Sequence, residues 1–509
     1  MRTNPPKPVA LNAPQQQSVM DRAPGQSRAY AVVSKLHQPA WCWSLAFLFA
    51  GFYVVSSLYI SSRRLLWYDE IYTALTSRQP DVRTMWKLLT EVWWEQIPPL
   101  YFLITRIFDQ LFRHADIGMR IPSVLGLGAG MLVTFDIARR LTDGLYGLIA
   151  MALLSTSFVT YYGYEARPYA LCFMLAAMAL WLWVVTKDES KTGTAAFGAL
   201  FLIGTAIHYY FILCLVPFGI CALAQGRIFH RKVMAAAVGV MCSLVVLYPQ
   251  IANSRALVRS PDTTLWALPT IAALQRVYLE FFPVAMIPLV LITVGAVVFG
   301  RSRDRLVTAM SPGERVSWLF LTVPLAAYLL AQLVTHFFYN RYVIEAVPGI
   351  AVALTCLFWR HFRESGYLSL ALLVVFGGYG VLQQLRTLRG IDHIQAFGDH
   401  QTRTRQMLAL EDTLQREGKT RFAVTFKLLF LEAWYYSKHP EQYESITSHP
   451  RDGVTKYIPL HFVSVEEIVA NARQTAVIDP GPALAEALER AGLHLKVRFA
   501  DPLYVVYLE

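Results

Sequence analysis

Long apolar stretches recur along the first 385 residues of the chain, and short polar segments separate them. The first stretch is Trp41–Ile60, which has about the 20 residues that a helix needs to cross a bilayer. We expect it to be an uncleaved anchor, because a signal peptide would begin nearer the N-terminus. Ten further runs lie near 120–138, 144–162, 168–186, 194–207, 209–225, 233–251, 281–300, 316–336, 342–359 and 366–385. The pattern predicts an α-helical polytopic membrane protein with about eleven transmembrane helices in residues 41–385.

The segment Pro98–Phe112 is apolar but short, and its polar residues decide how we interpret it. It is 15 residues long and carries Arg106, Asp109 and Gln110, which are costly at the centre of a membrane. We therefore expect an amphipathic helix at the outer interface. The N-terminal tail and the loops on its side then hold 18 Lys and Arg in about 80 residues, against 13 in about 100 on the other side. This bias places the N-terminus in the cytoplasm and the C-terminus outside.

Residues 386–509 alternate short apolar runs with polar segments and turn signals. Short strands are expected at Arg421–Phe426, Thr475–Asp479, Leu493–Phe499 and Leu503–Leu508, and a helix at Ala483–Ala491. Strands that alternate with helices are typical of a layered α/β arrangement. The pattern predicts a small soluble α/β domain at 386–509, outside the cytoplasm.

The composition agrees with a membrane protein, since 55% of the residues are apolar and 16% are charged. These values exclude a disordered chain, collagen, a coiled coil and a small disulfide scaffold. The net charge of +11 arises within residues 1–385, where 31 Lys and Arg face 19 Asp and Glu, so nucleic-acid binding is not needed to explain it. Residues 1–40 are predicted to be a disordered cytoplasmic tail. All six cysteines lie in hydrophobic stretches, where small packing residues are expected.

On this topology, the polar residues that can carry chemistry collect on the outer side. The first outer loop, 61–119, supplies the candidate catalytic residues Asp69, Glu70 and Glu95. The candidate substrate-binding residues are Arg120, Glu165, Arg167, Tyr169, His208 and Arg341. A carboxylate can deprotonate an acceptor or bind a metal, and the planar fork of arginine suits a phosphate. The set predicts a site for a lipid phosphate whose tail stays in the bilayer while its head group reacts outside.

Each candidate also has a purely structural interpretation. The acidic residues of the first loop suit the starts of helices. Glu165 and Arg167 can form an interfacial ion pair. His208 can be a packed side chain, and Arg341 can be an interfacial anchor. The order of these residues and their shared side favour a functional site over the separate structural interpretations.

Taken in order, the motifs resemble those of the bacterial GT-C glycosyltransferases, which are similar to the protein O-mannosyltransferases and the lipid A aminoarabinose transferase. The resemblance covers roughly residues 40–350. It is carried by the early Asp-Glu pair, E-x-x-P-P-L-Y from Glu95, R-x-P-S from Arg120, the segment Tyr164–Tyr169 and R-Y-x-x-x-x-x-P from Arg341. It implies an enzyme that moves a sugar from a polyprenyl-phosphate carrier to an acceptor on the outer face, with inversion.

The resemblance also implies roles for single residues. Asp69 matches the essential acidic residue of the first loop and is the candidate general base. The matching positions Arg120, Arg167 and Arg341 suit the carrier phosphate.

Glu95 matches a second acidic residue that binds a metal in some members. However, Ile97 stands where many relatives have histidine, and 252–280 contains no histidine. A divalent metal therefore stays an open question, with Glu95 as its candidate ligand.

The expected function is a hexosyl- or pentosyltransferase of the bacterial inner membrane. Its partners would be a polyprenyl-phosphate sugar donor, membrane lipids and an envelope acceptor (a lipid, glycan or protein). The alternatives are a transporter or flippase of lipid-linked sugars and a non-catalytic assembly or sensor protein. The polar residues lie at the outer ends of the spans and no internal repeat is visible, which favours the enzyme.

Overall fold

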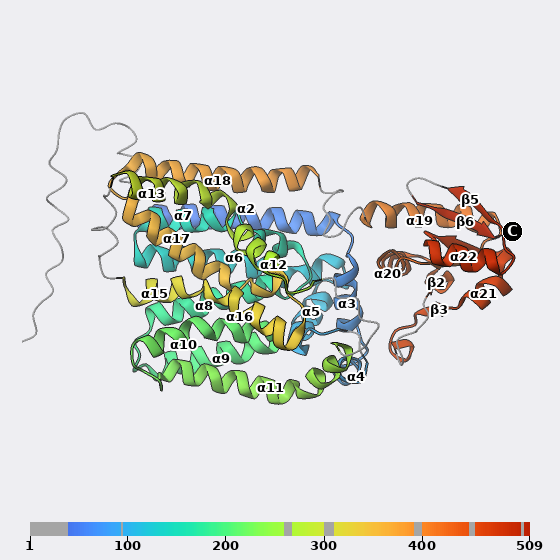
Figure 1. Ribbon diagram of the computed structural model, residues 1–509, viewed down its shortest axis with the longest axis horizontal. Helices are drawn as coiled ribbons and strands as arrows, with labels where there is room; N and C mark the ends of the chain where they lie inside the picture. The colour runs from blue at the N-terminus through green and yellow to red at the C-terminus, as the bar shows by residue number, and fades with distance from the viewer. Residues whose placement is uncertain are drawn as a thin grey trace, which may run out of the picture.

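The computed structural model describes residues 39–92, 95–258, 267–299, 310–390, 400–446, 454–499 and 503–508. Long helices lie side by side along the molecule, and a unit of strands and shorter helices extends beyond one end of this helical body (Figure 1). The predicted tail at 1–40 lies outside the described residues except for its last two positions, which begin the first helix.

Apolar helices occupy the predicted places in the helical body. Five of those described are long enough to cross a membrane: α2 (Pro39–Arg63), α6 (Asp116–Leu141), α11 (Arg231–Val258), the stretch of α15 (Pro312–Leu319), α16 (Thr322–Leu330) and η4 (Ala331–Thr335), and α18 (Gly366–Arg389). Two bent pairs raise the number to seven: α7 (Gly144–Leu154) with η1 (Phe158–Tyr164), and α12 (Ile271–Phe281) with η3 (Pro283–Ala285) and α13 (Met286–Phe299). Shorter apolar helices are α8 (Tyr169–Val185), α9 (Lys191–Ile207), η2 (Tyr209–Cys214) with α10 (Leu215–Ala224), and α17 (Ala346–Phe362). The remaining short elements are α3 (Tyr68–Ser77), α4 (Val82–Glu91), α5 (Pro99–Leu111) and η5 (Asn340–Val343).

The apolar run near 144–162 folds as two helices, α7 and η1, which meet at an angle of 71°. Between them, the hydroxyl groups of Ser155, Thr156 and Ser157 each donate to a backbone carbonyl three residues earlier. Such side-chain bonds compete with the helical backbone ladder, so the helix ends here. The chain therefore turns just before the polar segment Tyr164–Tyr169.

The helix α5 forms from the predicted amphipathic segment and is not among the helices apolar or long enough to span a membrane. Its polar side chains contact the rest of the loop 61–119. Arg106 donates to the carbonyl of Ser77 at 3.1 Å, and Asp109 accepts from Arg78 at 3.1 and 3.0 Å. These polar side chains of α5 are thus hydrogen-bonded within the loop. That α5 lies along the outer interface stays a prediction.

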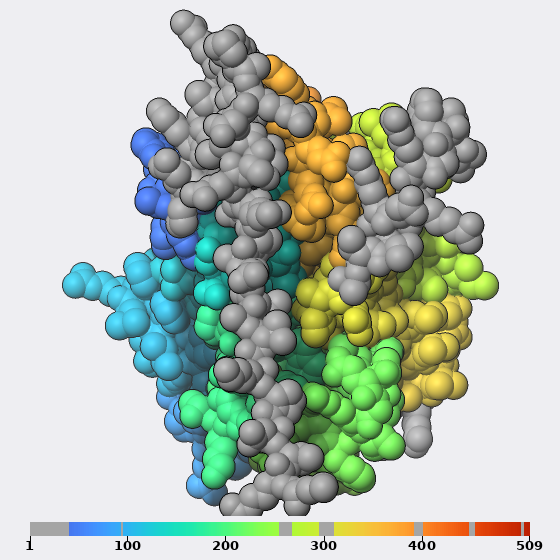
Figure 2. Space-filling model, turned by 90° about the vertical axis from the view of Figure 1, so that its left-hand side faces the viewer, coloured from blue at the N-terminus to red at the C-terminus, as the bar shows by residue number. Residues whose placement is uncertain are grey.

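The described connections that the charge bias assigns to the cytoplasm gather at the end of the body opposite to the strands (Figure 1): 139–143, 187–193, 226–232, 310–315 and 360–365. Polar contacts join them in pairs: Arg360 to Glu314 at 2.9 and 2.5 Å, Trp359 to Asp143 at 3.2 Å, and Lys232 to Asp188 at 3.5 Å. Figure 2 faces this end and shows segments from the cyan to the orange part of the chain side by side. The number of spans and the side that faces the cytoplasm stay predictions.

The unit beyond the other end is a six-stranded mixed sheet with the order β3-β2-β1-β4-β6-β5. β1 to β4 form parallel pairs, whereas β6 is antiparallel to both β4 and β5. The strands are β1 (Arg421–Val424), β2 (Tyr443–Ile446), β3 (His461–Val463), β4 (Thr475–Ile478), β5 (Leu495–Phe499) and β6 (Val505–Leu508). Helices accompany them at α19 (His400–Arg416), α20 (Lys427–Tyr436), α21 (Val465–Ala470) and α22 (Pro482–Arg490). The four strands and the helix expected from the sequence coincide with β1, β4, β5, β6 and α22.

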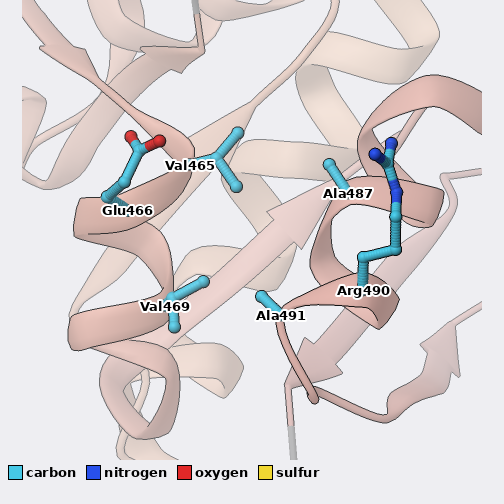
Figure 3. Close-up of a pocket in the computed structure, with 6 residues that line it drawn as sticks. All are labelled: Val465, Glu466, Val469, Ala487, Arg490 and Ala491. Carbon is cyan, nitrogen blue, oxygen red and sulfur yellow. The ribbon is translucent and has the colours of Figure 1, made fainter.

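An open hollow on the surface of this unit lies between α21 and α22 (Figure 3). Its lining is mainly small and aliphatic, with Glu466 and Arg490 as its charged residues. The hollow shares no residue with the outer candidates of the sequence analysis, and we assign it no role.

The sheet unit packs directly on the loop 61–119 through α20. Tyr436 donates to the carboxylate of Asp116 at 2.6 Å, and its hydroxyl oxygen accepts from the amide of Leu66 at 2.6 Å. Glu432 accepts from the amide of Tyr68 at 3.2 Å. Apolar side chains from the loop and from the sheet unit share one buried core. The C-terminal unit therefore contributes to the position of α3.

Candidate active site

Asp69 lies in the first turn of α3, where it meets an arginine from a distant part of the chain. Its Oδ2 accepts a hydrogen bond of 2.9 Å from Arg341, which is 272 residues away in η5. The side chain of Asp69 is 18% exposed, and that of Arg341 is 9% exposed. The two charges compensate each other while the carboxylate stays accessible at the surface of the site.

Arg341 rests on aromatic rings. Its guanidinium carbon lies 5.6 Å from the ring centre of Tyr169, 5.7 Å from that of Tyr339 and 5.4 Å from that of Tyr342. The electron-rich faces of aromatic rings attract a cation and limit where it can move. The predicted Tyr169 thus supports Arg341 beside Asp69.

Arg167 forms the second arginine of the site and is paired with Glu95 at 2.8 Å. The same guanidinium nitrogen donates to the backbone carbonyl of Asp69 at 3.0 Å. Its Nε is buried and has no hydrogen-bond partner among the described residues. An unused buried donor on a guanidinium suits an incoming anion such as a phosphate. The structure therefore brings the predicted residues Asp69, Glu95, Arg167, Tyr169 and Arg341 together.

Glu70 and Arg120 lie beside this cluster but form a closed, fully buried ion pair. Arg120 donates to both oxygens of Glu70, at 2.7 and 2.5 Å. Its remaining donors are bonded to the carbonyls of Ser61, Arg64 and Leu65, so all five N–H groups of Arg120 are used. The structure does not leave Arg120 a donor for a phosphate, and it does not expose Glu70 to a substrate.

The carboxylate of Glu70 also closes the start of α3. Its oxygens accept from the amides of Ala166 at 2.6 Å and Trp67 at 3.2 Å. Burial favours the neutral acid, but the Arg120 guanidinium outweighs it and lowers the pKa of Glu70. Glu70 is thus a charged group that ties α3 to α6 and to the segment Tyr164–Tyr169.

Glu165 does not pair with Arg167, contrary to the structural interpretation that would join them. It is buried and lies 3.9 Å from Arg64, at the end of α2. Burial raises the pKa of Glu165 to about 7, against the opposing effect of the Arg64 charge. Arg64 is a partner that sequence reasoning missed, because the Arg63-Arg64 pair after the first span was counted only as loop charge.

His208 stands behind the aromatic rings rather than beside Asp69. Its ring lies 5.5 Å from that of Tyr169 and 6.2 Å from that of Tyr342, with the latter stacked. The side chain is buried, and its Nδ1 has no hydrogen-bond partner among the described residues. His208 can therefore position the rings that support Arg341.

The surroundings of Glu95 do not suit a metal. Its Oε2 accepts from Arg167, and its Oε1 accepts from the amides of Gln96 at 2.8 Å and Ile97 at 3.4 Å. Among the described residues, one group of His, Cys and Glu side chains has ligand atoms close enough together to bind a single metal ion. Glu95 does not belong to that group. We therefore derive no catalytic step through a metal at Glu95.

Comparison with known proteins gives a family match for part of the chain. The family model of dolichyl-phosphate-mannose-protein mannosyltransferase matches residues 96–252, which contain Arg120, Glu165, Arg167, Tyr169 and His208. No curated protein matches the chain. The match covers the middle of the helical body and includes Arg167 of the paired site.

Solved structures extend the likeness over nearly the whole chain. ArnT from Cupriavidus metallidurans in the apo state superimposes with a TM-score of 0.59 at 12% identity, over 92% of this chain and 98% of that one. ArnT from the same organism bound to undecaprenyl phosphate gives 0.56 at 13% identity, over 91% and 97%. The fold is therefore similar to that of ArnT, and together with the family match this confirms the resemblance to the GT-C glycosyltransferases.

Proposed function

We propose that the chain transfers a hexosyl or pentosyl group, with inversion, from a polyprenyl-phosphate-linked donor to a lipid, glycan or protein of the cell envelope. The observation that carries the proposal is Asp69 between two arginines, with Arg341 on its carboxylate and Arg167 on its carbonyl. The solved complex of ArnT with undecaprenyl phosphate supports the choice of carrier. A membrane-embedded carrier also suits a site at the end of a bundle of apolar helices.

The reaction is a single displacement at the anomeric carbon. The acceptor hydroxyl attacks that carbon, and the bond from carbon to phosphate oxygen breaks with its electrons left on the phosphate. Asp69, hydrogen-bonded to Arg341, takes the acceptor proton. Arg167 and Arg341 stabilise the charge that develops on the leaving phosphate.

The neighbouring groups position these three residues. Glu95 orients Arg167, and Tyr169 supports Arg341. The sequence predicts that Glu70 and Arg120 act on the substrate. We assign them instead the role of holding α3 in position. Glu165 and His208 are assigned to the packing behind the site.

The proposed topology has eleven spans, with the C-terminal α/β domain at 386–509 outside the bacterial inner membrane. Two observations among the described residues support this number. There are seven candidate spans when each bent pair is counted as one span, and there are four shorter apolar helices. Cysteines introduced at Thr192 and Ala483, which are exposed at opposite ends of the molecule, test the orientation in a background with Cys242→Ser. A membrane-impermeant thiol reagent should label Ala483→Cys and spare Thr192→Cys in spheroplasts. The reverse result would invert the topology.

The experiment that tests the activity begins with a strain that lacks this chain. Mass analysis of its envelope lipids, glycans and proteins identifies the acceptor that loses a sugar. Purified wild-type, Asp69→Asn and Asp188→Asn proteins are then given that acceptor and its carrier-linked donor. Asp188 lies in an ion cluster at the opposite end of the molecule and serves as the control.

We expect product from the wild type and from Asp188→Asn and almost none from Asp69→Asn. Equal turnover by Asp69→Asn would refute the general-base role. A flippase would leave the donor unconsumed and would move it across vesicle membranes whether or not Asp69 is present.

A further inference from the structure

Three side chains that the proposed reaction does not use converge inside the helical body. Cys172 comes from α8, His208 from the junction of α9 and η2, and Glu345 from the residue before α17. Their sulfur, nitrogen and oxygen ligand atoms all lie within 4.8 Å of one another. All three residues are buried. The elements that supply them are separated in sequence, so the tertiary packing creates the cluster.

The three groups lack the partners that buried polar groups normally have. His208 Nδ1 has no hydrogen-bond partner among the described residues. The carboxylate oxygens of Glu345 have no hydrogen-bond partner there apart from the thiol of Cys172 and the amide of Glu345 itself. The nearby arginines Arg167 and Arg341 are paired with Glu95 and Asp69. Buried polar groups without partners are uncommon, so an occupant is expected.

The donor set points to the chemical class of that occupant. Thiolate, imidazole and carboxylate are the ligands that zinc takes in proteins, and three protein ligands leave a fourth position for water. A divalent ion with one thiolate, one carboxylate and a neutral imidazole forms a neutral unit, which suits a buried site. Zinc–ligand bonds of about 2.0–2.3 Å place tetrahedral ligands about 3.3–3.8 Å apart, so the side chains need to close by only about 1 Å.

We propose that Cys172, His208 and Glu345 form a binding site for a zinc-class divalent cation. The ion fixes His208, whose ring stacks on Tyr342 and meets the edge of Tyr169. These two rings support Arg341. The site is therefore structural and lies behind the aromatic rings, separate from the carboxylates Asp69 and Glu95. This inference does not depend on the proposed transfer reaction.

The test measures metal in the purified full-length protein. Wild type, Cys172→Ser, Glu345→Gln and His208→Asn are purified in detergent without metal-affinity resin, and zinc is measured by inductively coupled plasma mass spectrometry. Cys356→Ser controls for the loss of a buried cysteine, and Asp69→Asn controls for ions at the outer carboxylates. Replacement of the ion by cobalt adds a readout specific to sulfur, because a thiolate bound to cobalt gives a charge-transfer band in the near ultraviolet.

We expect about one zinc per chain in the wild type and in both controls, and a loss of at least tenfold in each ligand variant. The cobalt band should be absent from Cys172→Ser and present in Cys356→Ser. Gel filtration in detergent shows which variants are folded, and apo wild type titrated with zinc gives a result that does not depend on any variant. A wild type that binds neither zinc nor cobalt would overturn the inference. The inference would also be overturned if Cys172→Ser kept its bound metal while Asp69→Asn lost it. That result would not affect the proposed transfer reaction.

Discussion

Asp69 and Glu70 are neighbours in the sequence but belong to two different environments. Glu70 is fully buried and accepts four hydrogen bonds, two from Arg120 and two from backbone amides. Asp69 is partly exposed and pairs with Arg341, which rests on aromatic rings at the surface of the site. Saturated bonding makes Glu70 part of the scaffold, whereas its partial exposure leaves Asp69 accessible for the proposed reaction. The number and burial of the partners therefore separate the two roles better than residue type does.

The geometry of α3 explains why adjacent acids differ. Successive residues of a helix point about 100° apart, so Asp69 and Glu70 face different neighbours. Glu70 is the third residue of the helix, from where its side chain reaches back to the amide of Trp67. Asp69 faces Arg341 instead.

The largest expected effect is on stability, from Glu70→Gln. This change leaves the buried Arg120 charge without its counter-charge, and breaking one side of a buried pair costs about 3–5 kcal/mol. Thermal unfolding in detergent should show a large loss for Glu70→Gln and little change for Asp69→Asn. If the two variants have the same midpoint of unfolding, the contrast between scaffold and site is wrong.

The next effect is on the rate of sugar transfer. Asp69→Asn preserves size but cannot accept a proton, so turnover should fall by about 10²–10⁴-fold. Binding of the carrier should stay near normal, since Arg167 and Arg341 are retained. Product formation and carrier binding, measured on the same preparation, separate the two quantities. A variant that loses carrier binding as much as turnover would mean that Asp69 positions the arginines instead.

A smaller effect is expected on carrier affinity from Arg167→Lys. Lysine keeps the charge but loses the planar fork and the unused Nε donor, so the Kd for undecaprenyl phosphate should rise about tenfold. Arg227→Lys, at the opposite end of the molecule beside Asp188, is the matched control. Unchanged affinity in Arg167→Lys would restrict this residue to its pairing with Glu95.

The smallest effect concerns the contact of the sheet unit with α3. Burial raises the pKa of Glu432 to about 7, with smaller effects from Thr404, the Tyr68 amide, Arg64 and Glu70. The folded state thus keeps a proton that the unfolded chain releases near 4.5, the ordinary value. The stabilising contribution of this proton is complete below that pH and is lost as pH rises through about 7.

We therefore expect the α3 amides to be less protected from hydrogen exchange at pH 8 than at pH 6, after correction for intrinsic rates. The free energy of protection should fall by on the order of 1 kcal/mol. Glu432→Gln, which is neutral at both values, should remove the difference. Glu441→Gln, an exposed glutamate of the same unit, should keep it. A wild-type profile without pH dependence would mean that Glu432 does not report on this contact.

Much of the fold could be predicted from the chain alone, because hydrophobic length and periodicity are local properties. The apolar runs, the division at His208 and the strands β1 and β4 are visible as uninterrupted apolar patterns. β2 and β3 were not predicted, since Tyr443–Ile446 and His461–Val463 are short and partly polar. Their strand form depends on pairing with β1, which no local pattern contains.

The sequence by itself determined that this is a membrane-embedded chain, and its ordered motifs selected the acids and arginines of one region. Tertiary structure alone decided the partners: Asp69 with Arg341, Glu95 with Arg167, Glu70 with Arg120, and the enclosed group of Cys172, His208 and Glu345. The physical reason is that charge pairing and burial depend on distances between segments far apart along the chain. A residue's type shows which bonds it can make, and only its neighbours in space decide whether those bonds remain available to a substrate.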